Sequence, residues 1–319
     1  MTDTRLAIEV SHLTKRFGTL TAVNDVSFTV QPGVVTGFLG PNGAGKTTTM
    51  RMLTGLVTPT SGTATIGGQR YAQLSRPSSV VGAVFDANAF HPGHTARDHL
   101  RVYAAMGGHP DSRVAELLDR FGLASAANRR TGTFSTGMRQ RLNLATALLG
   151  DPRVLLLDEP SNGLDPEGIS WLRGFLRGLA AEGRTVLISS HVLSEIEQFA
   201  DDVVVLRHGE LIAAGPWSQL AGPPSILVGS PDADILADVL AAQPSTSRVE
   251  PIGPGRLRVF GLDAAGVADA AAAQGLRVHE LTTQGSNLEE LFLQLTADKL
   301  AADKPVLAGP TPLTQAGAR

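Results

Sequence analysis

The feature that most constrains this chain is a glycine-rich run, Gly40-Pro41-Asn42-Gly43-Ala44-Gly45-Lys46-Thr47-Thr48. It follows the apolar stretch 34–39, which has the composition of a buried strand, and we expect a helix to begin near Lys46. In this context the spacing is that of a phosphate-binding loop. The glycines let successive backbone N–H groups point at phosphate oxygens, and the helix dipole adds to their attraction. Lys46 is expected at the β- and γ-phosphates and the Thr47 hydroxyl on Mg²⁺; the alternative is a glycine-rich turn without a ligand.

A second apolar stretch, 154–157, ends in the paired acids Asp158 and Glu159. Such a strand places both carboxylates at the carboxyl edge of its sheet, where ligands bind in α/β folds. Asp158 suits the ligand shell of Mg²⁺, and Glu159 can orient or deprotonate an attacking water. Strands often end in polar loops, so the acids alone are weak evidence. Together with the phosphate-binding loop they predict nucleotide hydrolysis.

Strands alternate with helices along residues 5–221, which predicts an α/β cassette with a mainly parallel sheet. Apolar residues at helical spacing from about 87 to 150 predict an inserted helical subdomain. Glycines and prolines in 214–224 are typical of a linker. Residues 222–300 follow a β-α-β-β-α-β-α order, which can close as a small ferredoxin-like α+β domain. The tail 301–319, rich in Ala, Pro, Gly and Thr, is predicted to be disordered.

Composition excludes several classes of protein. The chain has no cysteine, so disulfides, thiolate metal sites and cysteine nucleophiles are excluded. A net charge of −3 and a pI near 6.2 give no electrostatic footprint for nucleic acid or an anionic membrane. No apolar run reaches the roughly 18 residues of a membrane span, so action at a membrane would need a partner. A small GTPase is disfavoured because no Asn/Thr-Lys-x-Asp motif is present.

A third motif is specific enough to indicate a family. The run 134–138, Phe-Ser-Thr-Gly-Met, opens a predicted helix, and Ser135 alone would be interpreted as its N-cap. Lying between the phosphate-binding loop and the acidic strand, it resembles the Leu-Ser-Gly-Gly-Gln signature of ABC transporter ATPases. Ser135 and Gly137 match that signature, whereas Thr136 and Met138 depart from it. The resemblance implies a P-loop NTPase fold in which Ser135 and the Gly137 N–H contact the γ-phosphate bound on a second subunit.

The same resemblance gives roles to further residues. Asp165 closes 161–165, which is similar to the family's D-loop, and His191 matches a histidine that contacts the γ-phosphate and helps to hold the attacking water. A lone histidine is more often structural or on the surface. Phe17 occupies the place of the aromatic that stacks on adenine, although it could equally belong to the core. Asp86 stands where the family has a glutamine that touches Mg²⁺ and senses the membrane partner, which suggests a modified Q-loop.

The motifs run in the family's order from about residue 5 to 215, and 287–292 resembles the tail of daunorubicin-exporter ATPases. The resemblance implies a homodimer that binds and hydrolyses ATP with Mg²⁺ at the cytoplasmic face of the membrane. It would energise a separate multi-helix permease and export drugs, antibiotics or other hydrophobic compounds, with no nucleic acid as partner. Two alternatives stay open: a soluble ABC-type ATPase acting on a ribosome or nucleic acid, and a poorly hydrolysing nucleotide-gated regulator.

Overall fold

The computed structural model describes residues 6–85, 90–220 and 224–284. The largest sheet in these residues has six strands, of which five are parallel and one is an antiparallel edge strand. In spatial order the strands are β5 (Val81–Val84), β6 (Val154–Asp158), β7 (Thr185–Ser190), β3 (Val35–Leu39), β8 (Asp202–Arg207) and β9 (Glu210–Pro216). The predicted α/β class with a mainly parallel sheet is confirmed.

The inner strands of this sheet are covered on both faces, which explains why their sequences are mainly apolar, whereas the edge strand β9 is only half-buried. Along β6, Val154 and Leu156 belong to one hydrophobic core, whereas Leu155 and Leu157 belong to the other. Successive side chains of a strand point to opposite faces, so a strand covered on both sides is apolar at most of its positions. The sheet therefore separates two layers that carry different parts of the site.

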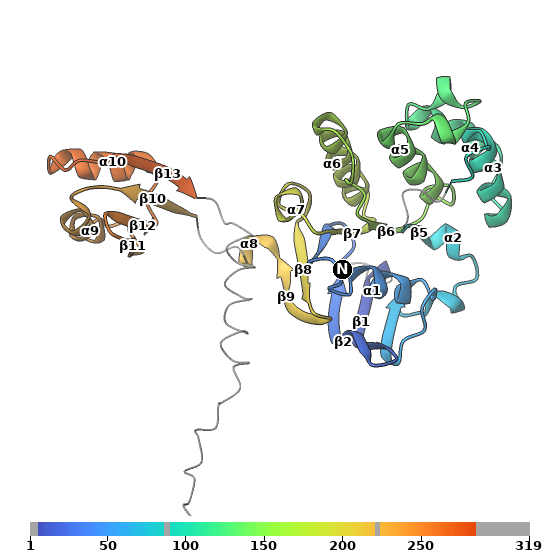
Figure 1. Cartoon of the computed structure of the whole chain (residues 1–319), viewed down its shortest axis with the longest axis horizontal. Helices are drawn as coiled ribbons and strands as arrows, with labels where there is room; N and C mark the ends of the chain where they lie inside the picture. The colour runs from blue at the N-terminus through green and yellow to red at the C-terminus, as the bar shows by residue number, and fades with distance from the viewer. Residues whose placement is uncertain (1–5, 86–89, 221–223, 285–319) are drawn as a thin grey trace, which may run out of the picture.

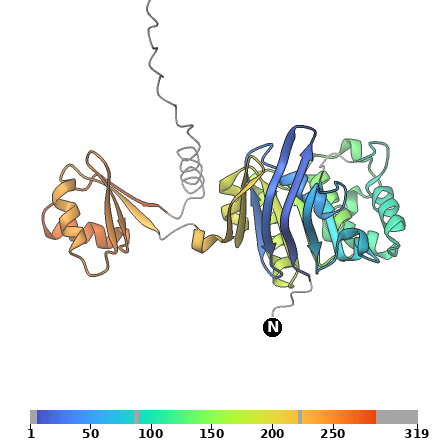
Figure 2. The same ribbon diagram turned by 90° about the horizontal axis from the view of Figure 1, so that it is seen from below.

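An antiparallel sheet and a helix cover one face, drawn in blue in Figures 1 and 2. Their elements are β1 (Ile8–Phe17), β2 (Leu20–Val30), β4 (Ser61–Ile66) and α1 (Lys46–Leu53). The apolar pattern of the sequence predicts two strands in this layer, at 6–10 and 26–30. It does not predict β4 or the full length of β1 and β2, because these strands carry exposed polar residues and bulges that disturb the alternation.

Helices cover the opposite face, drawn in green in Figure 1. They are α3 (Ala96–Gly107), α4 (Ser112–Arg120), α5 (Thr136–Ala147), α6 (Pro166–Ala181) and α7 (Leu193–Phe199). Short turns η3 (Ala124–Ala126) and η4 (Thr131–Thr133) lie between these helices, whereas η2 (Tyr71–Gln73) and α2 (Pro77–Val80) pack against the first layer through Tyr71 and Val80. Phe121 packs edge-on against Trp171 and Phe175, and these two rings stack on each other at 5.4 Å, which joins the end of α4 to α6. Across the residues that the structure describes, no helix has the length and apolarity needed to span a bilayer.

His99 on α3 is a buried titratable group inside this helical layer. Its ring is 4% exposed and packs against Phe90 and Tyr103. Thr146 donates its hydroxyl hydrogen to the Leu142 carbonyl, so the Thr146 oxygen is left to accept from His99 Nε2 at 3.1 Å. Burial, and to a smaller extent the neighbouring His94, lowers the pKa of His99 to about 4.

We expect stability to fall as the pH drops from 6.5 towards 4, because the unfolded chain then takes up a proton on His99 that the folded chain does not. The loss attributable to His99 is at most about 3 kcal/mol. Urea unfolding at pH 7 and pH 5 measures it in the wild type and in His99→Gln, whose amide can still donate to Thr146. The substitution should flatten the pH dependence; an unchanged slope between the two pH values would contradict this assignment.

The sequence predicts a strand pair at 203–206 and 210–213 with His208-Gly209 as its turn, and the structure confirms this hairpin as β8–β9. The linker predicted at 214–224 is wrong in part. His208 and Gly209 have φ of 50° and 80° between the two strands. β9 then continues to Pro216, the register partner of Asp202, and α8 (Trp217–Leu220) follows directly. Residues 214–216 thus belong to the sheet, and Pro216 is tolerated because it lies at the end of an edge strand.

Residues 224–284 contain a separate four-stranded antiparallel sheet in the order β11-β12-β10-β13. The elements are β10 (Ser225–Gly229), α9 (Ala233–Ala241), β11 (Arg248–Gly253), β12 (Arg256–Phe260), α10 (Ala264–Ala273) and β13 (Glu280–Gln284). Their order matches the predicted ferredoxin-like arrangement, and their apolar side chains form a core of their own. The predicted final helix at 288–298 and the tail from 301 lie outside the described residues.

Candidate active site

A hollow of about 340 Å³ opens where β1, β2 and the glycine-rich loop meet. Its wall contains Asn42 to Thr48 of the loop, Leu20 and Ala22 of β2, Glu159, and Phe17 at the end of β1. Phe17 is 48% exposed, so it does not belong to the core. The aromatic ring and the glycine-rich loop, far apart in the sequence, thus line the same hollow.

Two glycines of the loop could not be replaced by a residue with a side chain. Gly40 has φ 152°, and a Cβ there would lie 2.3 Å from the Leu206 carbonyl oxygen. Gly45 has φ 102°, and its Cβ would lie 2.6 Å from the Ala22 carbonyl oxygen. These distances are well below van der Waals contact. The loop packs directly on neighbouring backbone, which fixes the course of the chain before α1.

Lys46, the first residue of α1, is buried at the floor of the loop. Only 5% of it is exposed, and Nζ donates to the Gly40 carbonyl at 2.6 Å. Glu159 Oε1 lies 3.7 Å from the same nitrogen. Burial lowers the pKa of Lys46, and the nearby Glu159 and Asp158 carboxylates oppose that shift. A buried cation beside a phosphate cradle is suited to bind anionic oxygen.

Asp158 at the end of β6 is held by hydroxyl groups from two other elements. Thr47 Oγ1 donates to Asp158 Oδ2 at 2.7 Å, and Ser189 Oγ donates to Asp158 Oδ1 at 2.5 Å. Sequence reasoning missed Ser189. The signal available was a hydroxyl at the end of the buried stretch that precedes His191, but only the strand register, which pairs Ser189 with Asp158, shows the contact.

Glu159 leaves the strand with a left-handed backbone, φ 50°, which costs about 1 kcal/mol or more for a residue with a side chain. Its N–H donates to Ser189 Oγ at 2.9 Å, and His191 Nδ1 lies 2.9 Å from Oε2. An ionised carboxylate only accepts hydrogen bonds, so Nδ1 carries the proton in this pair. The structure brings Lys46, Glu159 and His191 together, as the sequence motifs indicated.

The other predicted residues lie elsewhere. Ser135 is the N-cap of α5 and accepts from Met138 N at 3.3 Å, and Gly137 lies in the first turn of that helix. α5 packs on the opposite face of the central sheet from α1. Asp165 caps α6 by accepting from Gly168 N at 2.8 Å. None of these three is among the described residues of the hollow. Asp86 lies outside the residues that the structure describes.

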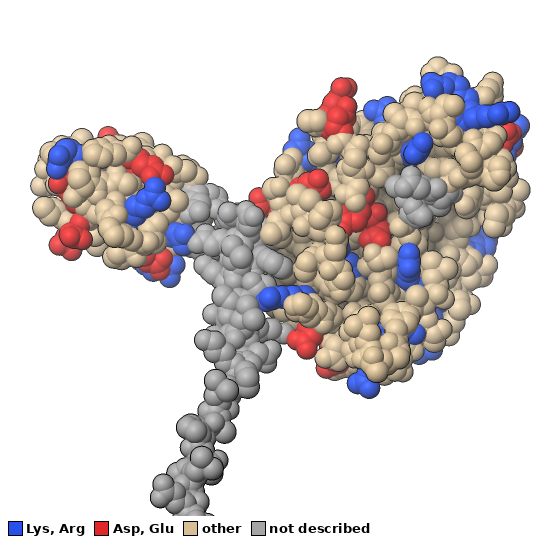
Figure 3. Space-filling model, viewed as in Figure 1, with Lys and Arg blue, Asp and Glu red and all other residues tan. Residues whose placement is uncertain are grey.

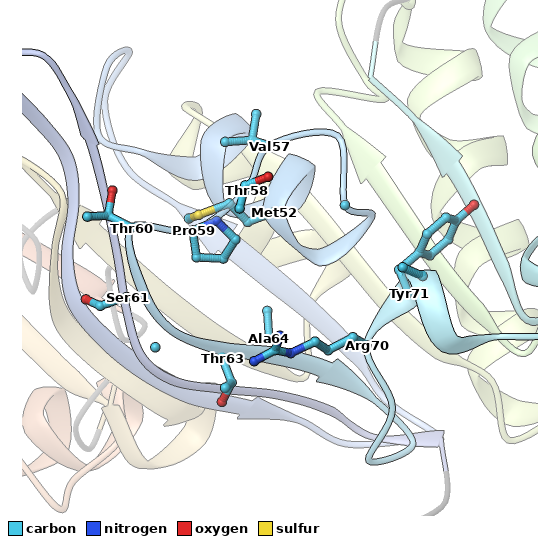
Figure 4. Close-up of a pocket in the computed structure, with 13 residues that line it drawn as sticks. Met52, Val57, Thr58, Pro59, Thr60, Ser61, Thr63, Ala64, Arg70 and Tyr71 are labelled. Carbon is cyan, nitrogen blue, oxygen red and sulfur yellow. The ribbon is translucent and has the colours of Figure 1, made fainter.

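A second hollow, of about 350 Å³, lies between the end of α1, β4 and η2 (Figure 4). Its wall has threonine hydroxyls, apolar side chains such as Met52 and Val57, and one cation, Arg70. Among its described residues there is no carboxylate and no part of the glycine-rich loop. The first hollow alone of these two combines a phosphate cradle with acidic side chains.

A phosphate cradle between a buried parallel strand and a helix, with a lysine, a threonine and two acids at the same sheet edge, defines a P-loop nucleotide hydrolase. Comparisons with known proteins agree. The model of the ABC transporter family matches residues 23–162, and the model of a domain of unknown function matches residues 224–289.

Among curated relatives, a bacitracin transport ATP-binding protein of Bacillus licheniformis is 42% identical over 67% of this chain and 71% of its own. Another bacitracin transport ATP-binding protein, from Enterococcus faecalis, is 36% identical over 90% and 96%. A solved ATP-binding subunit of an ABC transporter, 25% identical, superposes with a TM-score of 0.64 over 91% of this chain and 99% of its own. The chain belongs to the family of ABC transporter ATP-binding proteins, and it is an ATPase subunit of that type.

Proposed function

We propose that the chain hydrolyses ATP as a head-to-tail homodimer and energises a separate multi-helix permease that exports hydrophobic antibiotics or drugs. The observation that carries the proposal is the placement of two motifs. Lys46, Thr47 and Glu159 line the hollow, whereas Ser135 and Gly137 lie on α5, beyond the central sheet. A second copy turned to face the first would bring Ser135 and Gly137, at the start of its α5, to the open side of the hollow. Within one chain these two residues do not reach the hollow.

In this proposal each residue near the hollow has a distinct task. Phe17 stacks on the adenine ring, and Lys46 with the loop N–H groups holds the β- and γ-phosphates. Glu159 accepts a proton from the attacking water as the water oxygen bonds to the γ-phosphorus and the bond to the β–γ bridging oxygen breaks. The products are ADP and phosphate. His191 holds the Glu159 carboxylate by its 2.9 Å contact.

The oxygen groups of Thr47 and Asp158 fit Mg²⁺. They lie 2.7 Å apart, and hydroxyl and carboxylate oxygens are the donors that this ion prefers. Mg²⁺ is usually bound through one or two protein oxygens and completes its coordination with waters and phosphate oxygens. When bound, Mg²⁺ would supply charge neutralisation on the phosphates. Asp86 is proposed as a further ligand from its place in the sequence alone.

The relatives support the choice of cargo. Two of them carry names that assign them to bacitracin transport, and one of these is similar to this chain over 90% of its length. A role on nucleic acid has no comparable support. On the face shown in Figure 3, basic and acidic side chains are interspersed, and the whole chain has a net charge of −3. The cytoplasmic face of the membrane is the proposed location.

The test is reconstitution with the permease from the neighbouring reading frame, if that frame encodes several apolar helices. We expect the permease to bind the chain in detergent and to stimulate its ATPase activity. Co-expression should raise bacterial resistance to bacitracin-like antibiotics, and the same pair with Glu159→Gln should not. Stimulation by ribosomes or nucleic acid instead of the permease would favour the soluble alternative, and wild-type turnover no faster than that of Glu159→Gln would favour the poorly hydrolysing regulator.

A further inference from the structure

The loop of residues 161–165, which follows the acidic pair, is tied to the start of α7. Ser161 is 4% exposed, and its hydroxyl donates to Glu195 Oε2 at 2.5 Å. Gln140 of α5 donates from Nε2 to the Asn162 carbonyl at 3.3 Å. The loop is thus anchored on one side by a buried amide and on the other by a carboxylate.

The same carboxylate oxygen of Glu195 reaches the end of β7. Ser190 Oγ lies 3.4 Å from Glu195 Oε2 and accepts from Val192 N at 3.0 Å. Ser190 is 2% exposed and immediately precedes His191. One half-buried carboxylate therefore contacts both chain segments that flank Glu159: the loop two residues after it and the segment that carries its histidine partner.

We propose that Glu195 is a positioning residue for hydrolysis, which holds His191 and Glu159 in their 2.9 Å contact by joining the two segments. His191 is the connection between β7 and α7, and 40% of its side chain is exposed, so packing alone does not fix its ring. Glu159 is separated from Ser161 by a single residue. Loss of the Glu195 carboxylate frees both segments at once, while the phosphate-binding loop keeps its own contacts.

The inference rests on the hydrolytic role proposed for Glu159, and its test uses ratios to the wild-type chain. Glu195→Ala should lower kcat about 10-fold, as expected for displaced catalytic groups, with the Kd for ATP unchanged. Ser161→Ala should have a similar effect, and the double variant should lose no more than either single one, because both remove the same contact. Glu195→Gln should recover most of the activity, since its amide oxygen still accepts from Ser161.

Gln198→Ala is the control, because Gln198 is exposed on the same helix and contacts Arg173 and Ser194. It should keep wild-type kcat. Thermal unfolding of each variant checks that the fold is intact. The positioning role is overturned if Glu195→Ala keeps wild-type kcat, if its Kd for ATP rises in parallel, or if the losses of the two single variants multiply. A wild-type chain without turnover would contradict the proposed hydrolysis itself. Normal wild-type turnover that Glu195→Ala leaves unchanged would overturn the positioning role alone, so the two failures are distinguishable.

Discussion

Glu159→Gln should lower ATP turnover roughly 10²- to 10⁴-fold, the range expected when a general base is removed. The amide keeps the size of the side chain but cannot accept the proton of the attacking water. ATP binding should persist, because the loop N–H groups and Lys46 are untouched. A chain that binds ATP without hydrolysing it should accumulate as a dimer, so gel filtration with ATP and Mg²⁺ should show a larger species than without nucleotide.

Glu9→Gln is the matched control, since Glu9 is exposed on β1 and the substitution is chemically identical. It should leave turnover and the elution volume unchanged. Full turnover in Glu159→Gln would remove the proposed role of that carboxylate. A Glu159→Gln variant that binds ATP and turns it over slowly but stays monomeric would instead contradict the head-to-tail arrangement. The role of Glu159 as the general base would then stand.

The parts of the site that lie close together in the sequence could be predicted from it. The strand, the glycine-rich loop and the helix beginning at Lys46 are consecutive, and their spacing reflects local geometry that no other part of the fold has to supply. The acids that follow β6 and the histidine that follows β7 were found in the same way, because parallel strands end at a common edge.

Contacts between segments far apart could not be predicted. Ser189 and Asp158 are 31 residues apart, and they meet only because β6 and β7 pair in one particular register. No motif in the sequence singles out Glu195, and its bond to Ser161 depends on how α7 packs. The sequence did not decide whether Phe17 contacts a ligand or belongs to the core, since it does not show which side of a bulged strand faces a ligand.

Lys46→Ala should weaken ATP binding by roughly 10- to 100-fold or abolish it, because charge-assisted hydrogen bonds of this kind contribute about 1.5–3 kcal/mol each. The loop backbone stays, so its N–H groups alone would retain residual affinity for phosphate. Isothermal titration calorimetry with ATP measures the change. Arg51→Ala is the matched control: it removes one positive charge from the last turn of the same helix, on an exposed residue, and should bind like the wild type.

Stability should respond differently from binding in the same variant. The pKa of Lys46 is lowered in the folded chain, so below that pKa the folded state holds a cation that the unfolded chain would solvate better. Since folding disfavours the protonated form of Lys46, its burial lowers the free energy of unfolding at pH 7, and alanine relieves that cost, although it also removes the contacts of Nζ with Gly40 and Glu159. We expect Lys46→Ala to unfold at the wild-type temperature or above it while binding ATP poorly. Wild-type affinity in calorimetry would remove the phosphate-binding assignment, and a large drop in the unfolding temperature would show that the lysine is structural.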